Sequence, residues 1–401
     1  MPYPDNKMVM FDELETLLNE DISSVIDREH AAFDRLAAPF DEKSIVLFGA
    51  GQLGRKTLAG LRRRGIEPLA FSDNNVALWN KSIDGLRVIP PQEAAQKYGE
   101  KAVFVVTIFS GNLSGYRLAQ TKEQLLALKC LKVISFGFLF WKYAEIFLPY
   151  YFLDLPHKVY QQSRDIKKVF SLWADEQSCY VYTAQLRWRM QLDFDGLPGP
   201  ASGRPYFPLD IFSLADEEVF VDCGAYDGDT IKDFLQIRRS FSGKIIALEP
   251  DPQNFQKLQN FTSTLPVDIK EKVTVLPLAA GRLRRKLRFD AMGTESSNIS
   301  DTGDLEVSCL PLDEVLSDCI PTLLKMDIEG AEMDALAGAR KVIHDNTPIL
   351  AICVYHRQDD LWRIPLFIQS LSDRYRFFLR PYLEAGWDSI CYAVPVNRLI
   401  V

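Results

Sequence analysis

Residues 218–230 read Glu-Val-Phe-Val-Asp-Cys-Gly-Ala-Tyr-Asp-Gly-Asp-Thr, and this stretch decides the fold. The short apolar run Val219 to Val221 is typical of a strand that is buried on both faces. Gly224 and Gly228 follow, and apolar residues then recur at helical spacing. The pattern predicts a strand, a tight glycine turn and a helix. A glycine turn at the carboxyl end of a parallel strand lets a ligand approach the backbone closely.

An acidic residue ends each of the first two strands predicted in this region. The second strand, residues 244–248, runs into Glu249, whose carboxylate can accept both hydrogen bonds of a ribose diol. Asp222 ends the first strand, and a carboxylate there suits an ammonium or sulfonium better than a pyrophosphate. We therefore expect S-adenosylmethionine as the cofactor. A dinucleotide-binding fold with an unusual turn is the alternative.

Three motifs in this half of the chain resemble the signature of FkbM-type methyltransferases. They are Val-Asp-Cys-Gly-Ala-Tyr-Asp-Gly at 221–228, Leu-Glu-Pro-Asp at 248–251 and Leu-Lys-Met-Asp-Ile-Glu-Gly-Ala-Glu at 324–332. The resemblance covers about the last half of the chain and implies a class I, S-adenosylmethionine-dependent enzyme, typically an O-methyltransferase. It also implies that the turn binds the cofactor through Gly224, Ala225, Tyr226 and Gly228, although family members usually carry Asn at position 226.

The rest of this half is predicted to complete a doubly wound α/β sheet of seven strands, the class I methyltransferase fold. The third strand closes on Ala279 and Ala280, small residues that would let an adenine ring approach. Residues 286–289 and 305–309 are expected to form a hairpin or added strands. One of the last two strands is expected to be antiparallel. Strands three to seven are predicted at 273–278, 322–326, 348–354, 374–379 and 389–394.

Polar side chains follow the predicted fourth and fifth strands. Asp327 and Glu329 come after the fourth strand, and His356 comes after the fifth. Open α/β sheets bind ligands at these strand ends, so we predict Asp327, Glu329 and His356 as catalytic residues. His356 is the candidate general base because the ordinary pKa of histidine lies near neutrality. A hydrogen-bonded loop histidine is the alternative.

The two carboxylates after the fourth strand admit several roles. Asp327 and Glu329 are two residues apart and project to the same side of an extended chain. They could orient the acceptor, bind the amino group of the cofactor, or hold a divalent ion with Glu332 and water. Alternatively, Glu329 caps a helix beginning at Gly330, and Glu332 lies in the first turn of that helix. Because no histidine-rich sequence accompanies these carboxylates, no metal site is predicted.

A second glycine turn lies in the first half of the chain. Residues 49–54 read Gly-Ala-Gly-Gln-Leu-Gly between a predicted strand and a helix, and Asp73 follows the next strand. This context predicts a smaller Rossmann-like α/β domain. It resembles the domain that precedes some FkbM-type methyltransferases and the nucleotide-sugar-binding domain of sugar acyltransferases. Two interpretations of this turn remain open. It could bind a nucleotide or nucleotide sugar through Gly49, Gly51, Gly54 and Asp73, or it could serve packing alone.

With 401 residues the chain is long enough for two or three domains. We expect N-terminal helices and the Rossmann-like domain in 1–138, a helical aromatic connector and a loop in 139–205, and the methyltransferase domain in 206–401. The apolar spacing in residues 7–38 predicts one or two helices that pack on the next domain.

The composition limits the partners and the compartment. A net charge of -8 and a pI near 5.3 argue against a nucleic-acid partner. The cysteines are scattered, no signal-peptide pattern is present, and the apolar stretch 133–153 is interrupted by charges. We expect a cytoplasmic protein without a membrane partner. The sequence does not determine the oligomeric state.

These patterns predict transfer of a methyl group from S-adenosylmethionine to an acceptor. The expected acceptor atom is a hydroxyl oxygen of a sugar or another small metabolite. Two alternatives remain open: an NAD(P)-dependent oxidoreductase that uses the N-terminal glycine turn, and a non-catalytic nucleotide-sugar-binding protein.

Overall fold

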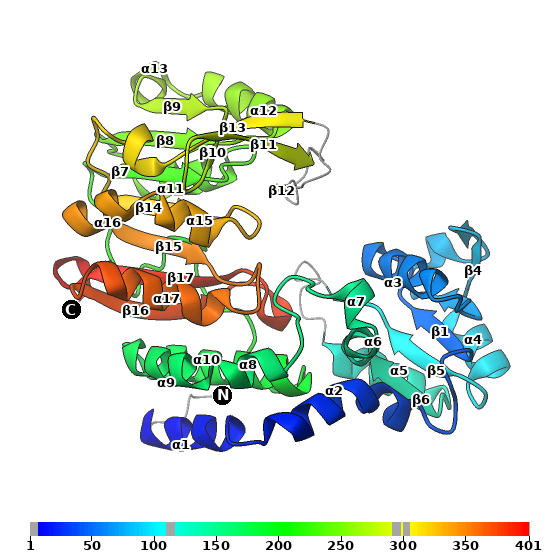
Figure 1. Cartoon of the computed structure of the whole chain (residues 1–401). Coiled ribbons are helices and arrows are strands. Elements are labelled where there is room, and N and C mark those ends of the chain that lie inside the picture. Colours follow the sequence, from blue (N-terminus) through cyan, green and yellow to red (C-terminus); the bar gives the residue numbers. More distant parts are fainter. Residues whose placement is uncertain (1–6, 110–116, 291–297, 300–304, 401) are drawn as a thin grey trace.

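The computed structural model describes residues 7–109, 117–290, 298–299 and 305–400. Two large sheets lie in different halves of the chain, and a helical segment lies between them in sequence (Figure 1). The first half holds a six-stranded sheet and the second half a seven-stranded sheet. The predicted α/β class and the predicted order of the parts are therefore confirmed.

The N-terminal sheet has the strand order β3-β4-β2-β1-β5-β6, and only β3 runs antiparallel to its neighbour. This is the Rossmann-like arrangement predicted from the glycine turn. The β3–β4 hairpin was not predicted, because its strands are short and β3 is polar. The strands are β1 (Ile45–Phe48), β2 (Ala70–Ser72), β3 (Ser82–Ile83), β4 (Leu86–Ile89), β5 (Val103–Val106) and β6 (Lys132–Ser135), and the helices are α3 (Gln52–Arg63), α4 (Pro91–Tyr98) and α5 (Leu118–Ala127).

The second sheet has the order β16-β17-β15-β14-β7-β8-β9, and β17 runs antiparallel to both of its neighbours. The seven strands and the single antiparallel strand are as predicted. The central strands β14 and β15 are completely buried, which explains why their sequence is apolar apart from Lys325. The strands are β7 (Val219–Cys223), β8 (Lys244–Leu248), β9 (Val273–Leu276), β14 (Leu323–Met326), β15 (Ile349–Cys353), β16 (Tyr375–Pro381) and β17 (Ser389–Pro395).

Helices connect these strands and cover the sheet. They are α11 (Asp229–Ile237), α12 (Pro252–Ser263), α13 (Val267–Lys270), α14 (Leu312–Val315), α15 (Glu332–Ala337), α16 (Arg340–Asn346) and α17 (Asp360–Leu371).

The prediction of one strand over residues 273–278 is wrong. The strand β9 ends at Leu276, and β10 (Leu278–Ala280) joins a separate four-stranded sheet with β11 (Arg285–Asp290), β12 (Asn298–Ile299) and β13 (Leu305–Leu310). Pro277 lies at the break, where its missing amide hydrogen cannot serve a sheet ladder. Ala279 and Ala280 therefore lie in the small sheet, where both are buried. Their contact with an adenine ring stays a prediction. The antiparallel pair β11–β13 confirms the predicted hairpin.

The connector is helical. Its last helix lies against the β16 edge of the second sheet, whereas its first two helices pack on the N-terminal domain (Figure 1). Ala174 donates a backbone hydrogen bond to the carbonyl of Phe377 in β16 at 2.8 Å. Among the described residues, no helix is both long enough and apolar enough to cross a membrane. The connector helices are α6 (Phe136–Lys142), α7 (Ala144–Phe147), α8 (His157–Gln161), α9 (Ser163–Leu172) and α10 (Glu176–Gln191).

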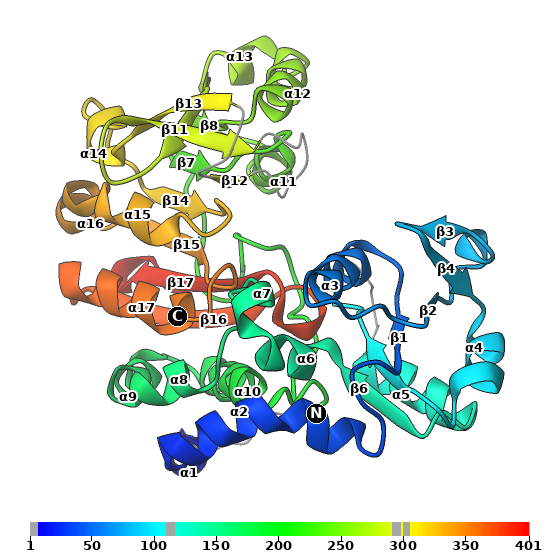
Figure 2. The same cartoon turned by 45° about the vertical axis from the view of Figure 1, so that its right-hand side comes forward.

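The first two helices, α1 (Lys7–Leu17) and α2 (Ile22–Ala37), run along the outer side of the connector (Figures 1 and 2). The helix α2 contacts α6 and β6, so it packs on the N-terminal domain as predicted. The prediction is wrong for α1, which packs on α9 and α10 instead. Lys7 Nζ anchors it by donating to the carbonyl of Trp173 at 2.6 Å.

Aromatic side chains join the two halves of the molecule. Phe109, which follows β5, stacks on Trp188 of α10 with ring centroids 5.5 Å apart. The same ring lies 5.1 Å from Trp387, in the loop between β16 and β17. These residues belong to one hydrophobic core that runs through both halves. Many of the connector aromatics therefore serve inter-domain packing.

Candidate active site

A buried ion pair lies at the centre of the second sheet. Asp222 lies near the end of β7, Lys325 lies beside it in β14, and Lys325 Nζ is 3.1 Å from Asp222 Oδ1. Burial raises the pKa of Asp222, and although Lys325 opposes this effect, the value is about 6. Burial lowers the pKa of Lys325, but the carboxylates of Asp222 and Asp327 outweigh it and raise the value. Both groups are therefore charged at neutral pH.

Lys325 also holds the predicted glycine turn in place. Its Nζ donates to the carbonyl oxygen of Gly224 at 2.6 Å. Gly224 has a φ of +79°, and a Cβ atom there would lie 1.9 Å from the carbonyl oxygen of Asp327. Only glycine fits, and the turn packs directly on the chain that follows β14. The sequence analysis missed Lys325, although the motif at 324–332 contains it.

Asp222 lies beneath the turn and does not reach the ligand edge of the sheet. Its side chain is 0% exposed, and its charge is balanced by Lys325. The direct contact with an ammonium or sulfonium that the sequence suggested does not fit this position. The structure instead gives Asp222 an indirect role, because it holds the lysine that holds the turn.

Glu249 lies at the end of β8, beside the same turn. Its Oε2 accepts a hydrogen bond from the amide of Tyr226 at 2.8 Å, and its Oε1 accepts one from the amide of Asp251 at 2.8 Å. Burial raises the pKa of Glu249 to about 7, against the opposing effect of these two amides. Each oxygen keeps a further lone pair, so the carboxylate can still accept hydrogen bonds from two hydroxyl groups.

The remaining turn residues are constrained by backbone conformation and packing. Tyr226 has a φ of +49°, a conformation that Asn tolerates best among residues other than glycine. This explains why Asn is usual there in FkbM-type sequences. Gly228 has a φ of +93°, and a Cβ atom there would lie 2.4 Å from the ring of Phe261. Ala225 is completely buried under the turn.

A second polar cluster follows β14 and β15. His356 Nδ1 is 2.9 Å from Glu332 Oε1, while Nε2 is 3.5 Å from Asp327 Oδ1 and 3.8 Å from Glu329 Oε1. The structure therefore brings together Asp327, Glu329 and His356, as their strand-end positions predicted. It also corrects the view of Glu332 as an ordinary first-turn residue, because this side chain is completely buried and accepts the amide of Ile328.

The surrounding carboxylates change the chemistry of His356. Burial lowers its pKa, but Glu332, Glu329 and Asp327 outweigh burial and raise the value to about 10. In the chain alone the ring is therefore positively charged at neutral pH. A general base must be unprotonated, so these carboxylates disfavour the role of base, which stays a prediction for His356.

Tyrosine hydroxyl groups hold Asp327 in place. The hydroxyl of Tyr206 donates to Asp327 Oδ2 at 2.8 Å, and that of Tyr355 donates to Oδ1 at 3.4 Å. The ring of Tyr206 also lies 5.1 Å from Lys325 Nζ. Tyr206 was not among the predicted site residues.

Glu329 has a strained backbone. Its φ of +55° lies in the left-handed region, and Gly330 continues with a φ of +91°. Such strain in a residue other than glycine persists where surrounding contacts enforce it, and it gathers at functional sites. Arg357 Nε donates to the carbonyl of Gly330 at 2.8 Å and holds this conformation.

The N-terminal turn repeats the arrangement seen at Glu249. Asp73 Oδ2 accepts the amide of Ala50 at 2.7 Å, and Oδ1 accepts the amide of Asn75 at 2.7 Å. A Cβ atom at Gly54 would lie 2.0 Å from the carbonyl oxygen of Gly49, whereas no atom approaches within 4 Å of one at Gly51. The turn is thus closed on its packing side and open at Gly51.

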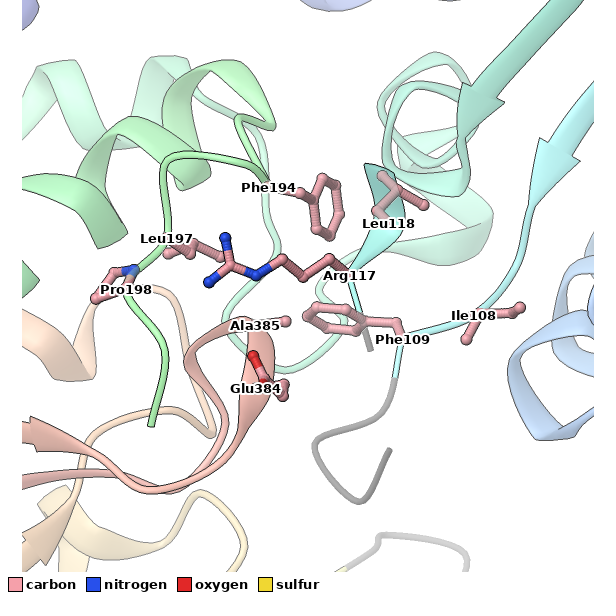
Figure 3. A pocket seen from close by; sticks show the side chains of 9 residues that line it. All are labelled: Ile108, Phe109, Arg117, Leu118, Phe194, Leu197, Pro198, Glu384 and Ala385. Carbon is pink, nitrogen blue, oxygen red and sulfur yellow. The ribbon is translucent and has the colours of Figure 1, made fainter. Parts of the chain in front are cut away.

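A pocket lies between the two halves near this turn (Figure 3). Ile108 lines it and also packs against Gly49. Figure 3 shows the side chain of Arg117 extending from the N-terminal domain between Leu197 and Ala385. The pocket therefore combines apolar walls with one cationic and one anionic side chain, Arg117 and Glu384.

Residues 222–382 match the family model of the methyltransferase FkbM domain. The chain carries an FkbM methyltransferase domain. It is an S-adenosylmethionine-dependent methyltransferase, as the three motifs predicted, and this result favours methyl transfer over the oxidoreductase alternative. No curated protein matches the chain.

Solved structures show how far the fold extends. The crystal structure of methyltransferase FkbM from Methylobacillus flagellatus KT is similar over 97% of this chain and 100% of its own, with a TM-score of 0.79 and 22% identity. This likeness shows the fold, and it includes the N-terminal half. Precorrin-6y C5,15-methyltransferase from Geobacter metallireducens GS-15 covers 45% of the chain and 81% of its own, with 14% identity and a TM-score of 0.29, too low to carry an argument.

The residues at the ends of β7 and β8 fit S-adenosylmethionine, the cofactor of this family. The turn at Gly224 has no room for a side chain, so a ligand can lie against its backbone. Glu249 offers two carboxylate oxygens beside that turn. Gly224, Tyr226, Gly228 and Glu249 would hold the cofactor, while Asp222 and Ala225 support the turn from below.

Removing one member of the buried ion pair should destabilise the domain. Asp222→Asn leaves the buried ammonium group of Lys325 without its paired carboxylate, and we expect the free energy of unfolding to fall by roughly 3–5 kcal/mol. The double variant with Lys325→Met removes both charges and should recover most of this loss. Urea denaturation of the wild type, both single variants and the double variant measures the coupling. Strictly additive effects would contradict a coupled pair.

The affinity for S-adenosylhomocysteine should rise with pH around neutrality. Because its pKa is about 7, Glu249 is mostly protonated below this value and ionised above it, and the ionised form offers both oxygens as acceptors. We expect binding about tenfold tighter near pH 8 than near pH 6, measured by calorimetry. Glu249→Gln is the matched control and should bind weakly at every pH. Equal wild-type affinity across this range would contradict the role of Glu249.

Proposed function

We propose that this domain methylates a hydroxyl oxygen of a small molecule, such as a sugar or another metabolite. The observation that carries the proposal is the contact between the two polar sites. The cofactor turn packs at Gly224 on the carbonyl group of Asp327, the first residue of the carboxylate cluster. A hydroxyl group bound by this cluster would therefore lie next to the cofactor turn.

S-adenosylmethionine supplies a methyl group that its sulfonium already activates. The protein must hold the acceptor oxygen close to that group and take up the hydroxyl proton as the oxygen is methylated. Asp327 is held by two tyrosine hydroxyls, which suits it to orient the acceptor. Glu329, like Asp327, lies near Nε2 of His356, and its side chain is 18% exposed. We assign proton uptake to its carboxylate oxygen.

Aromatic groups beside the cluster suit a polar acceptor with an apolar face. Trp387 lies 5.7 Å from Tyr355 between ring centroids, and Tyr355 in turn contacts Asp327. Within the part of the chain that the structure describes, the buried Trp387 Nε1 has no hydrogen-bond partner. A sugar hydroxyl could accept from this group while the sugar ring packs on the aromatic faces.

Transfer of labelled methyl groups to a panel of alcohols, amines and thiols tests this proposal. We expect turnover with a hydroxylated acceptor, and we expect Glu329→Gln to lower kcat by about 100-fold or more without weakening S-adenosylhomocysteine binding. Glu271→Gln is the control and should retain activity, because Glu271 is exposed and lies far from Glu329 in the sequence. Turnover with amines or thiols alone would refute O-methylation, and cofactor binding without any turnover would favour a non-catalytic protein.

We also propose a nucleotide or nucleotide sugar as a ligand of the N-terminal turn. The shared arrangement of Asp73 and Glu249, together with the open side of Gly51, supports this second site.

Separate calorimetric titrations with NAD and a uridine-diphosphate sugar test the second site. Binding of either ligand should be lost in Asp73→Asn, while S-adenosylhomocysteine binding should be unchanged. If neither ligand binds the wild type, the turn serves packing alone.

A further inference from the structure

The cluster around His356 has the composition of a cation site. Asp327, Glu332 and His356 each present one ligand atom, and these atoms lie within 4.8 Å of one another. The set contains two carboxylates and one imidazole, a combination suited to transition-metal dications such as Mn²⁺ or Zn²⁺. The side chains of His356 and Glu332 are only 2% and 0% exposed, so the site is built into the fold.

The spacing of two of these groups fits shared ligation better than direct hydrogen bonding. His356 Nε2 lies 3.5 Å from Asp327 Oδ1, which exceeds the usual hydrogen-bond range of about 2.7–3.2 Å. Two ligands that each lie about 2.0–2.2 Å from one ion are separated by about 2.8–3.6 Å at angles between 90° and tetrahedral. The observed separation lies within that interval.

Unpartnered atoms point into the same cluster. Among the described residues, His356 Nε2 and Glu332 Oε2 have no hydrogen-bond partner although both are buried. Buried polar atoms are ordinarily partnered, so these two need an explanation. Glu332 Oε1 lies 2.9 Å from Nδ1 of His356, which leaves Nε2 facing Asp327. The other oxygen of this carboxylate, Oε2, is the unpartnered one, and it is the atom of Glu332 left to bind a cation.

The local charge balance favours a dication. Lys325 pairs with Asp222, whereas the buried carboxylate of Glu332 and the partly buried carboxylates of Asp327 and Glu329 lie 2.9, 3.5 and 3.8 Å from the ring nitrogens of His356. Arg357 directs its Nε to a backbone carbonyl group. Several buried carboxylates around one imidazole are costly unless positive charge compensates them.

We infer that Asp327, Glu332 and His356 bind a divalent cation at the carboxyl end of β14 and β15. The sequence left a divalent ion beside Asp327 and Glu332 open but predicted no metal site, because no histidine-rich sequence accompanies these carboxylates. The fold adds His356, which lies 24 residues from Glu332 in the chain. The catalytic use of the ion rests on the proposed function: beside the cofactor turn it would bind the acceptor hydroxyl and lower the pKa of that group. Binding itself does not depend on the acceptor.

Calorimetric titration of MnCl₂ into the full-length protein, stripped with a chelator and desalted, tests the site. We expect one Mn²⁺ per chain and an increase in the melting temperature on binding. Asp327→Asn and His356→Gln should each weaken binding at least about tenfold. His157→Gln is the matched control, because His157 Nδ1 lies 2.7 Å from Glu29 Oε1 in another histidine–carboxylate pair, and it should bind Mn²⁺ like the wild type.

The outcomes separate the site from its use. Circular dichroism identifies folded variants, and Asp327→Asn, whose side chain is 26% exposed in the wild type, replaces His356→Gln if the latter does not fold. Failure of the wild type to bind both Mn²⁺ and Zn²⁺ would overturn the inference, as would wild-type affinity in folded Asp327→Asn. Mn²⁺ binding without methylation of any hydroxyl acceptor would leave the metal site standing and refute the proposed function.

Discussion

The ion pair between Asp222 and Lys325 is the interaction on which the rest of this domain depends. It joins the neighbouring strands β7 and β14. The strands that follow β7 in the chain are added on one side of this pair, and those that follow β14 are added on the other side, so the pair marks the topological switch point of the sheet. The same ammonium group fixes the carbonyl of Gly224, so the turn and the sheet are held by one buried charge. Because the turn packs on Asp327, the position of the cofactor edge also sets the position of the carboxylate cluster.

The two halves of the molecule meet on the side of β16 and β17 (Figure 2). Phe109 and Trp387 pack together there, and Trp387 contacts Tyr355, whose hydroxyl donates to Asp327. The aromatic core between the domains is therefore continuous with the wall of the candidate acceptor site. This continuity gives a physical reason why the N-terminal domain and the connector accompany the methyltransferase domain: they support one side of its site.

Much of the fold was predictable from local patterns. The buried strands are recognisable because a strand covered on both faces is mostly apolar, and the glycines mark the turn because no other residue fits. Local sequence patterns gave wrong or incomplete predictions where contacts with other segments determine the structure. Residues 273–280 form one apolar run in sequence, yet Pro277 divides it between two sheets. The role of Lys325 was missed because a lysine within a strand is explained only by the carboxylate beside it.

The sequence by itself determined the family, the cofactor edge and the strand ends at which Asp327, Glu329 and His356 meet, because these features depend on local order and on the parallel sheet. The tertiary structure decided the chemical state of those groups. Asp222 became a buried support, and His356 acquired a raised pKa among three carboxylates. Glu332 became the partner of that histidine. Burial and the distance to other charges set such properties, and both arise only when distant segments pack together.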